Sequence, residues 1–136
     1  MRFLLLVIPA GYEKADPKAM PSPEAVAAMM KYNEEMQKAG ILLDLNGLTP
    51  PSAGARVSFT TGKPIVTDGP FIETKEAVGG YWMVRLNSKE EAIEWAKKCP
   101  MLNKETIEIR QIQEFDDFPQ DVQKAAEGFK EMQQKH

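Results

Sequence analysis

The chain has 136 residues, of which 43% are hydrophobic and 27% are charged, and its formal net charge is -3 at pH 7. This length and composition predict one globular domain with a sizeable core. Lysines and arginines are scattered among acids, so the chain lacks the clustered basic face that nucleic-acid binding requires, and no nucleic-acid partner is expected.

The amino-terminal segment, residues 2–8, is apolar after Arg2. It is too short to cross a membrane, and it runs directly into Pro9 and Gly11 rather than into a cleavage site. We interpret it as a strand that is buried on both faces. We therefore expect a cytoplasmic protein with no membrane partner.

The single cysteine, Cys99, excludes an internal disulfide. The single histidine is the last residue, His136, so no imidazole base is expected beside the thiol. Cys99 continues a stripe at helical spacing, and we interpret it as a buried structural thiol. The other members of that stripe are Ala92, Trp95 and Ala96.

The first helix has a clear start and stop. Ser22 is a predicted N-cap, Pro23 occupies the first helical position, and Gly40 ends the helix. A stripe at helical spacing favours core packing over a soft ligand pocket. Its members are Val26, Met29, Met30, Asn33 and Met36.

Five later segments are rich in strand-forming residues. They are residues 41–45, 56–60, 64–67, 81–86 and 106–112. The second and third of these predict a hairpin that turns at residues 61–63.

Two further helices are predicted. Ser88 and Glu91 fit a capping box, and the helix that they open ends near Pro100. Pro119 opens a carboxy-terminal helix whose apolar stripe must pack against its own domain or a neighbouring subunit. That stripe comprises Val122, Ala125, Ala126, Phe129 and Met132.

The order of these elements predicts an α+β protein with a ferredoxin-like split β-α-β fold, an inserted β-hairpin and an extra C-terminal helix. Two helices would cover one face of an antiparallel sheet and leave an apolar face open. Two such faces stacked together predict a homodimer, a dimeric α/β barrel. We assign residues 1–113 to this domain and residues 114–136 to a linker and a helix that packs on the body or on the partner subunit.

Asp68, in the run Asp68-Gly69-Pro70, has two interpretations. As a turn residue, its side chain bonds to backbone amides two residues on, while Gly69 permits a positive φ and Pro70 fixes the exit. As a catalytic residue, it is a general base or a hydrogen-bond acceptor for a ligand, provided that burial tunes its carboxylate.

Other polar side chains are candidates for ligand binding. Glu73 and Lys75 follow within one turn; they form a solvated charge cluster, or Lys75 holds an anionic group that Glu73 orients. Glu108 and Arg110 share one face of the last strand, where they form a structural ion pair or clamp a carboxylate. Tyr81 is a core residue or a hydroxyl donor at a barrel mouth.

No cofactor or metal site is predicted. The chain has no phosphate-binding glycine loop, no dinucleotide fingerprint, no nucleophile elbow and no Cys/His cluster. Asp68, Glu73 and Glu76 could ligate a hard cation, but their spacing does not match a calcium loop.

Residues 66–71 (VTDGPF), 73–76 (ETKE) and 79–81 (GGY) resemble the signature of the YCII-related family, in its DGPF-type branch. The resemblance extends over residues 1–113 and implies a dimeric α+β barrel. Some members carry a His-Asp pair proposed as catalytic, but the first helix here has no histidine. Members of this branch are also encoded beside, or fused to, alternative sigma factors, which implies a regulatory protein partner.

Two functions remain open. The first is a dimeric small-molecule-binding or regulatory module without settled catalysis. The alternative is a small-molecule enzyme that uses carboxylate acid/base chemistry around Asp68 in a barrel pocket. A deep cavity lined by Asp68, Tyr81 and Arg110 would favour the enzyme, whereas a closed barrel with these groups satisfied among themselves would favour the module.

Overall fold

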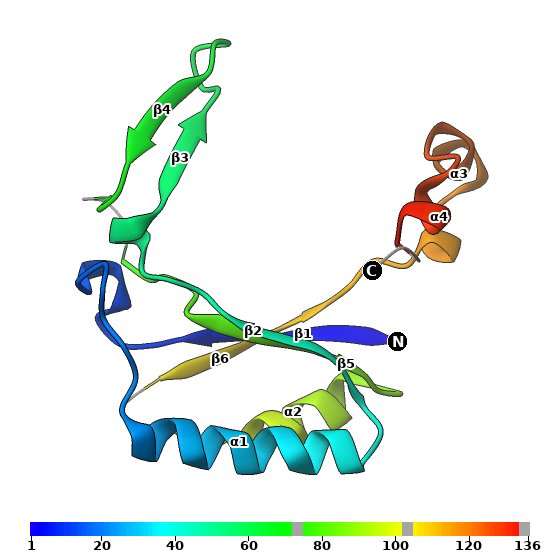
Figure 1. The fold of residues 1–136 in the computed structure, drawn as a ribbon. Helices are drawn as coiled ribbons and strands as arrows, with labels where there is room; N and C mark the ends of the chain where they lie inside the picture. Colours follow the sequence, from blue (N-terminus) through cyan, green and yellow to red (C-terminus); the bar gives the residue numbers. More distant parts are fainter. Residues whose placement is uncertain (72–74, 102–104, 134–136) are drawn as a thin grey trace.

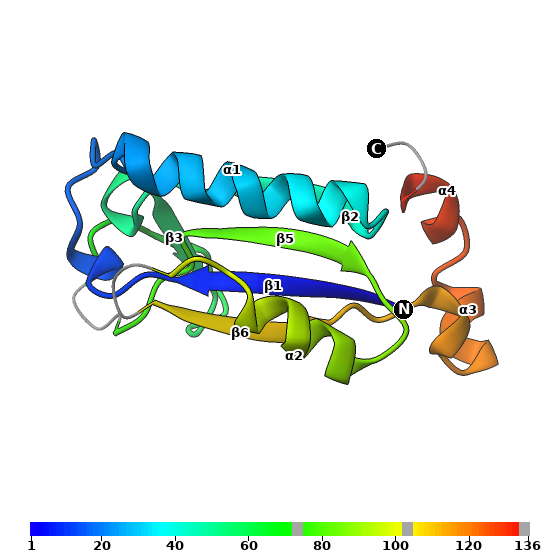
Figure 2. The same ribbon diagram turned by 90° about the horizontal axis from the view of Figure 1, so that it is seen from below.

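A computed structural model describes residues 1–71, 75–101 and 105–133 of the chain. Its centre is a four-stranded antiparallel sheet in the order β2-β5-β1-β6. The strands are β1 (Arg2–Ile8), β2 (Leu42–Gly47), β5 (Gly80–Arg85) and β6 (Thr106–Gln111). Helices α1 (Pro23–Lys38) and α2 (Lys89–Lys97) lie side by side on one face (Figures 1 and 2). This arrangement confirms the α+β class and is consistent with a ferredoxin-like fold.

Two arms project from the opposite face of the sheet, so that the molecule has the outline of a U (Figure 1). One arm is the predicted hairpin, a separate two-stranded sheet of β3 (Ala55–Ser58) and β4 (Ile65–Asp68). The other contains η3 (Phe115–Asp117), α3 (Gln120–Ala125) and α4 (Phe129–Gln133). Two short 3-10 helices, η1 (Tyr12–Lys14) and η2 (Pro51–Ala53), lie near the base of the hairpin arm.

The sequence predicted a single C-terminal helix. This prediction is wrong, because the segment is broken into α3 and α4. Gly128 adopts φ +91 between them, a left-handed conformation that interrupts a right-handed helix. The arm is held by the stacked rings of Phe115 and Phe129, whose centroids are 6.5 Å apart. An ion pair of 2.7 Å joins Lys130 to Asp116.

The core lies between the sheet and the two helices. Phe3 and Leu5 of β1 are buried there with Trp82 and Val84 of β5, whereas Leu4 and Leu6 alternate onto the other face. Within one chain, β1 is thus buried on one face and half-buried on the other, and burial on both faces stays a prediction that depends on a partner. The helices cover only one side of the sheet.

The buried stripe of α1 also differs from the predicted one. Met36 is buried and Met29 packs against the core, but Val26 and Met30 are exposed. Their place is taken by Tyr32, which is 2% exposed and meets the Trp82 ring edge-on at 5.2 Å. An aromatic edge-to-face contact stabilises the core beyond the area that it buries.

The predicted starts of α1 and α2 are confirmed. Ser22 accepts a hydrogen bond from the amide of Ala25, and Gly40 ends α1 with φ +74. Ser88 accepts from the amide of Glu91. The Glu91 carboxylate reaches back to the amide of Asn87, one residue before the cap, so the capping box is displaced by one position. None of the helices in the described ranges combines the length and the hydropathy of a membrane span.

Candidate functional site: the open face of the sheet

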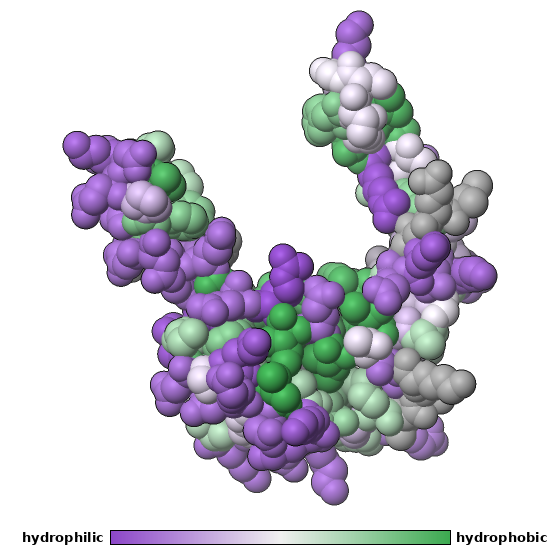
Figure 3. Space-filling view, turned by 180° about the vertical axis from the view of Figure 1, so that it is seen from behind, coloured by the Kyte–Doolittle hydropathy of each residue, from purple (hydrophilic) through white to green (hydrophobic). Residues whose placement is uncertain are grey.

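The open face of the sheet is organised in rows that run across the strands. In one row, Asp44, Met83, Leu4 and Arg110 are neighbours on β2, β5, β1 and β6. In the next row, Asn46, Tyr81, Leu6 and Glu108 are neighbours in the same order. The first row has an apolar centre and charged ends, and in the second row Leu6 is the apolar member. Figure 3 shows hydrophobic side chains gathered at the base of the U, between the two arms.

Three polar side chains form a connected cluster at the β2 edge. The hydroxyl of Tyr81 donates a hydrogen bond of 2.9 Å to Oδ2 of Asp44. Nδ2 of Asn46 donates a hydrogen bond of 2.9 Å to the same hydroxyl. Asp44 and Asn46 were not predicted, although two polar residues two apart in an apolar strand share one face and could have been noticed.

An ion pair occupies the β6 edge of the same face. Nη1 of Arg110 lies 3.4 Å from Oε2 of Glu108, and both side chains are exposed. Ile107 and Ile109 pack against the core, which confirms that Glu108 and Arg110 point to the other face. Leu6 lies directly between Glu108 and Tyr81, so the two polar edges are separated by an apolar strip.

Two arginines lie at one end of this face. Arg2 and Arg85 are direct partners across β1 and β5. Arg2 donates two hydrogen bonds to the carboxylate of Glu114, of 2.8 and 3.0 Å. Hydrogen bonding to Arg2 lowers the pKa of Glu114, because the charged form of the carboxylate is stabilised.

Asp68 lies elsewhere, at the exposed end of β4 in the second sheet. In the turn interpretation, the Asp68 side chain would accept a hydrogen bond from the amide two residues on. This is wrong, because that residue is Pro70, which has no N–H. The amide of Gly69 donates to the carbonyl of Gly54 at 2.9 Å. The structure thus places Asp68 on a different sheet from Tyr81 and Arg110 within one chain.

Gly69 is required for a different reason from the predicted positive φ. Its φ is not among the positive glycine values of the described residues, and its peptide bond to Pro70 is cis. A Cβ at this position would lie 1.8 Å from the carbonyl oxygen of Pro51. The glycine therefore permits two backbone segments to approach closely at the base of the hairpin.

The remaining residues of the signature surround this junction. The ring of Phe71 lies under the guanidinium of Arg56, whose carbon is 4.1 Å from the ring centroid. Lys75 is exposed. Glu73 lies outside the described residues, so the proposed pairing of Glu73 with Lys75 is not addressed by the structure.

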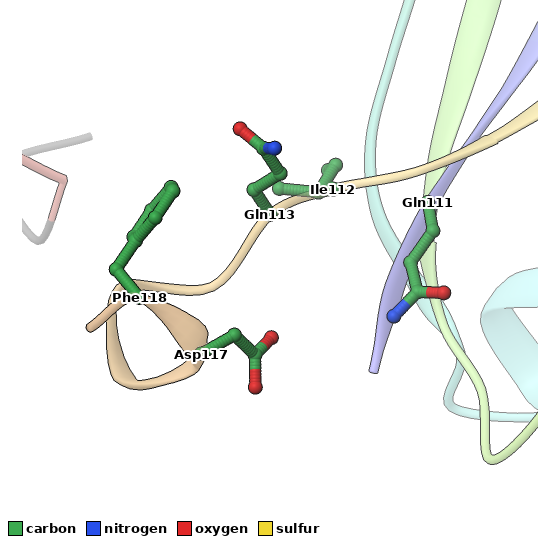
Figure 4. A pocket seen from close by; sticks show the side chains of 5 residues that line it. All are labelled: Gln111, Ile112, Gln113, Asp117 and Phe118. Carbon is green, nitrogen blue, oxygen red and sulfur yellow. The ribbon is translucent and has the colours of Figure 1, made fainter.

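Two of the open cavities among the described residues lie near the C-terminal arm and beside the signature. One, of about 360 Å³, is lined by Gln111, Ile112, Gln113, Asp117 and Phe118 where β6 leads into the C-terminal arm (Figure 4). The other, of about 690 Å³, lies beside the signature. It is lined by residues 13–17, Ser52, Gly69, Pro70 and Phe71. Neither cavity is lined by Asp68, Tyr81 or Arg110.

Two titratable groups are buried in the core, away from the open face. Burial raises the pKa of the Cys99 thiol to about 12, and its sulfur lies 4.0 Å from that of Met29. Burial likewise raises the pKa of Tyr32, whose hydroxyl donates to the carbonyl of Trp95 at 2.6 Å. The prediction that Cys99 is a buried thiol is confirmed.

Within the described ranges, no group of three or more His, Cys, Asp or Glu side chains could hold a metal ion.

The fold is that of an α+β domain with an open apolar sheet face and a separate β3-β4 hairpin that ends at the signature turn. The chain is a member of the YCII-related family, because the sequence profile of the YCII-related domain matches residues 1–116. It is also similar to an uncharacterised protein of Rhizobium meliloti, with 36% identity over 80 residues. That match covers 59% of this chain and 61% of the relative, so it spans less than two thirds of the relative's length.

Proposed function

We propose that the chain is a DGPF-type member of the YCII-related family that acts as a homodimeric small-molecule-binding or regulatory module. One observation carries the proposal: a sheet face with an apolar centre and hydrogen-bonded polar edges is left uncovered between two arms. A face of this kind is typical of an association or binding surface. Two copies stacked through it would enclose the polar edges in a barrel-like interior.

The exposed apolar side chains of the arms support the homodimer. Val57 and Val66 are direct partners across the hairpin, and they are 53% and 66% exposed. An isolated two-stranded hairpin has little stability of its own, so a partner surface against these side chains is expected. Phe129 and Met132 give the C-terminal arm a similar exposed apolar surface.

The pairing of polar side chains with one another on the open face favours binding over catalysis. Tyr81 is bonded to Asp44 and Asn46, and Arg110 is paired with Glu108. Polar side chains that are hydrogen-bonded or ion-paired with one another are expected of the non-catalytic module. A preformed catalytic pocket would instead present such groups to a substrate. The enzyme alternative needs Asp68 in an enclosed site, and in one chain this carboxylate is exposed.

The homodimer is tested by light scattering coupled to gel filtration at micromolar concentration. We expect a mass of twice the 15.2 kDa of one chain. A mass of one chain would contradict the proposal. Removal of residues 119–136 should reduce solubility, because that arm is expected to cover apolar surface of the body or of the partner.

Small-molecule binding is tested by a thermal-shift screen against metabolites. A ligand of the open face should raise the melting temperature of the wild type, and Tyr81→Phe or Arg110→Gln should reduce that shift. Lys97→Gln, on the exposed surface of α2, is the matched control. A dimer that responds to no metabolite would favour the regulatory role, with a protein partner to be sought next.

A further inference from the structure

The open face carries opposite charges at its two edges that cannot meet within one chain. Asp44 on β2 and Arg110 on β6 belong to the same row but are separated by β5 and β1. Three strand spacings place their backbones roughly 14 Å apart. Among the described residues, each side chain has a local partner: Tyr81 for Asp44, and Glu108 for Arg110.

We propose that a second copy of this chain docks on the open face in one register, in which Asp44 pairs with Arg110 of the partner subunit and the reverse pair forms on the other side. This inference rests on the proposed homodimer and specifies its symmetry. The two-fold axis runs parallel to the strands, between β5 and β1, so each β2 edge lies over the β6 edge of the other subunit.

The geometry follows from the symmetry of stacked sheets. A two-fold axis parallel to the strands reverses the order of the strands but leaves each row in place. The row of Asp44, Met83, Leu4 and Arg110 then faces its own reverse. Carboxylate meets guanidinium at both ends of the row, and Met83 meets Leu4 in the middle. Sheets packed face to face are about 10 Å apart, a distance that these side chains can bridge.

The second row is complementary in the same register. Asn46 comes to lie over Glu108 of the partner, and Tyr81 over Leu6 of the partner. One N–H of the Asn46 amide is donated to Tyr81, so the second N–H is available to a carboxylate. Only the arginine pair opposes the register, because Arg85 would face Arg2 of the partner. The charge of Arg2 is offset by its bidentate pair with Glu114.

The other possible two-fold axis, across the strands, gives a poorer match. It would stack β2 on β2 of the partner and β6 on β6. The β2 edge contributes the Asp44 carboxylate and the Asn46 amide to this face, so Asp44 would be covered without a cation. A buried carboxylate without a partner is unfavourable. The first axis also places the unpaired backbone edges of β2 and β6 side by side, which closes the barrel.

The experiment uses two charge reversals and their mixture. Asp44→Arg and Arg110→Asp are made separately in the full chain, and the dimer dissociation constant of each is measured by sedimentation velocity. Each variant alone should weaken the dimer at least about tenfold, since like charges face each other at both ends of the row. An equimolar mixture of the two should form heterodimers of nearly wild-type affinity, because one subunit then presents two cations to the two carboxylates of the other. Both ion pairs form, one in the wild-type orientation and one with its sign reversed.

Glu34→Arg, on an exposed position of α1, is the matched control and should leave the dimer unchanged. Circular dichroism establishes that each variant is folded. A wild-type dimer whose two variants do not rescue each other on mixing would overturn this register while leaving the homodimer intact. A wild-type monomer would instead overturn the homodimer itself, so the two failures are distinguishable.

Discussion

The indole Nε1 of Trp82 donates a hydrogen bond of 2.7 Å to Oδ1 of Asn33, which joins the central sheet to α1. Trp82 is 5% exposed, so this N–H depends on Asn33 for its partner. Asn33→Ala should therefore lower the free energy of unfolding by about 1–3 kcal/mol, because a buried donor is left unsatisfied. Urea denaturation followed by tryptophan fluorescence measures the change.

Two comparisons separate this bond from a general effect on the helix. Glu34→Ala alters the exposed neighbouring position and should change stability little. In a Trp82→Phe background, which lacks the N–H, the cost of Asn33→Ala should shrink. An equal cost in both backgrounds would show that the hydrogen bond is not the source of the stabilisation.

Substitution of Gly69 tests the close approach of two backbone segments at the base of the hairpin. Gly69→Ala should lower the free energy of unfolding by about 1–3 kcal/mol, because the new Cβ would overlap the carbonyl of Pro51. Gly54→Ala is the matched control at the same junction, since its Cβ would lie at an ordinary 3.5 Å from the same oxygen. Equal stabilities in urea titrations of the two variants would refute the steric argument.

The pair of Arg2 and Glu114 predicts a pH dependence of stability. Because the pKa of Glu114 is lowered in the folded protein, its contribution is complete above the ordinary value of 4.5 and is lost as the pH falls through the lower folded value. The side chains are 19% and 34% exposed, so screening by solvent limits the contribution to about 1 kcal/mol or less.

Glu114→Gln measures this contribution directly. The difference in unfolding free energy between wild type and variant should be largest at neutral pH and should vanish in acid. Glu127→Gln, an exposed carboxylate on the same arm, is the control and should show no such trend. A Glu114→Gln difference that persists unchanged below the folded pKa would contradict the assigned cause.

Much of the fold was predictable because its signals are local. Ser22 and Ser88 mark helix starts through bonds to amides three residues on, and strand alternation placed Ile109 and Arg110 on opposite faces. The break at Gly128 was missed because the apolar stripe continues through it. The left-handed conformation of Gly128 ends the helix, although the apolar periodicity of the sequence continues.

The site was less predictable because it depends on pairing between distant segments. Glu108 and Arg110 were expected to share a face, and the register of β1 with β5 and β6 places Tyr81 on that face with them. Asp44 and Asn46 join them only because β2 pairs with β5, a contact that no local pattern specifies. Gly69 was singled out correctly but for the wrong reason, since its neighbour Pro51 is distant in sequence.

Asp68 is the residue of the signature whose role is tested most directly by mutation. Its side chain is exposed and the amide of the next residue, Gly69, is bonded to the carbonyl of Gly54, so Asp68→Asn should change the free energy of unfolding by about 0.5 kcal/mol or less. If the signature forms part of a ligand site, the same change removes the charge but keeps the shape, and thermal shifts caused by ligands should disappear. Glu90→Gln, an exposed carboxylate on α2 and outside the signature, should retain those shifts. An Asp68→Asn protein that keeps both its stability and every ligand response would show that the signature serves only the turn, with Gly69 as its essential residue.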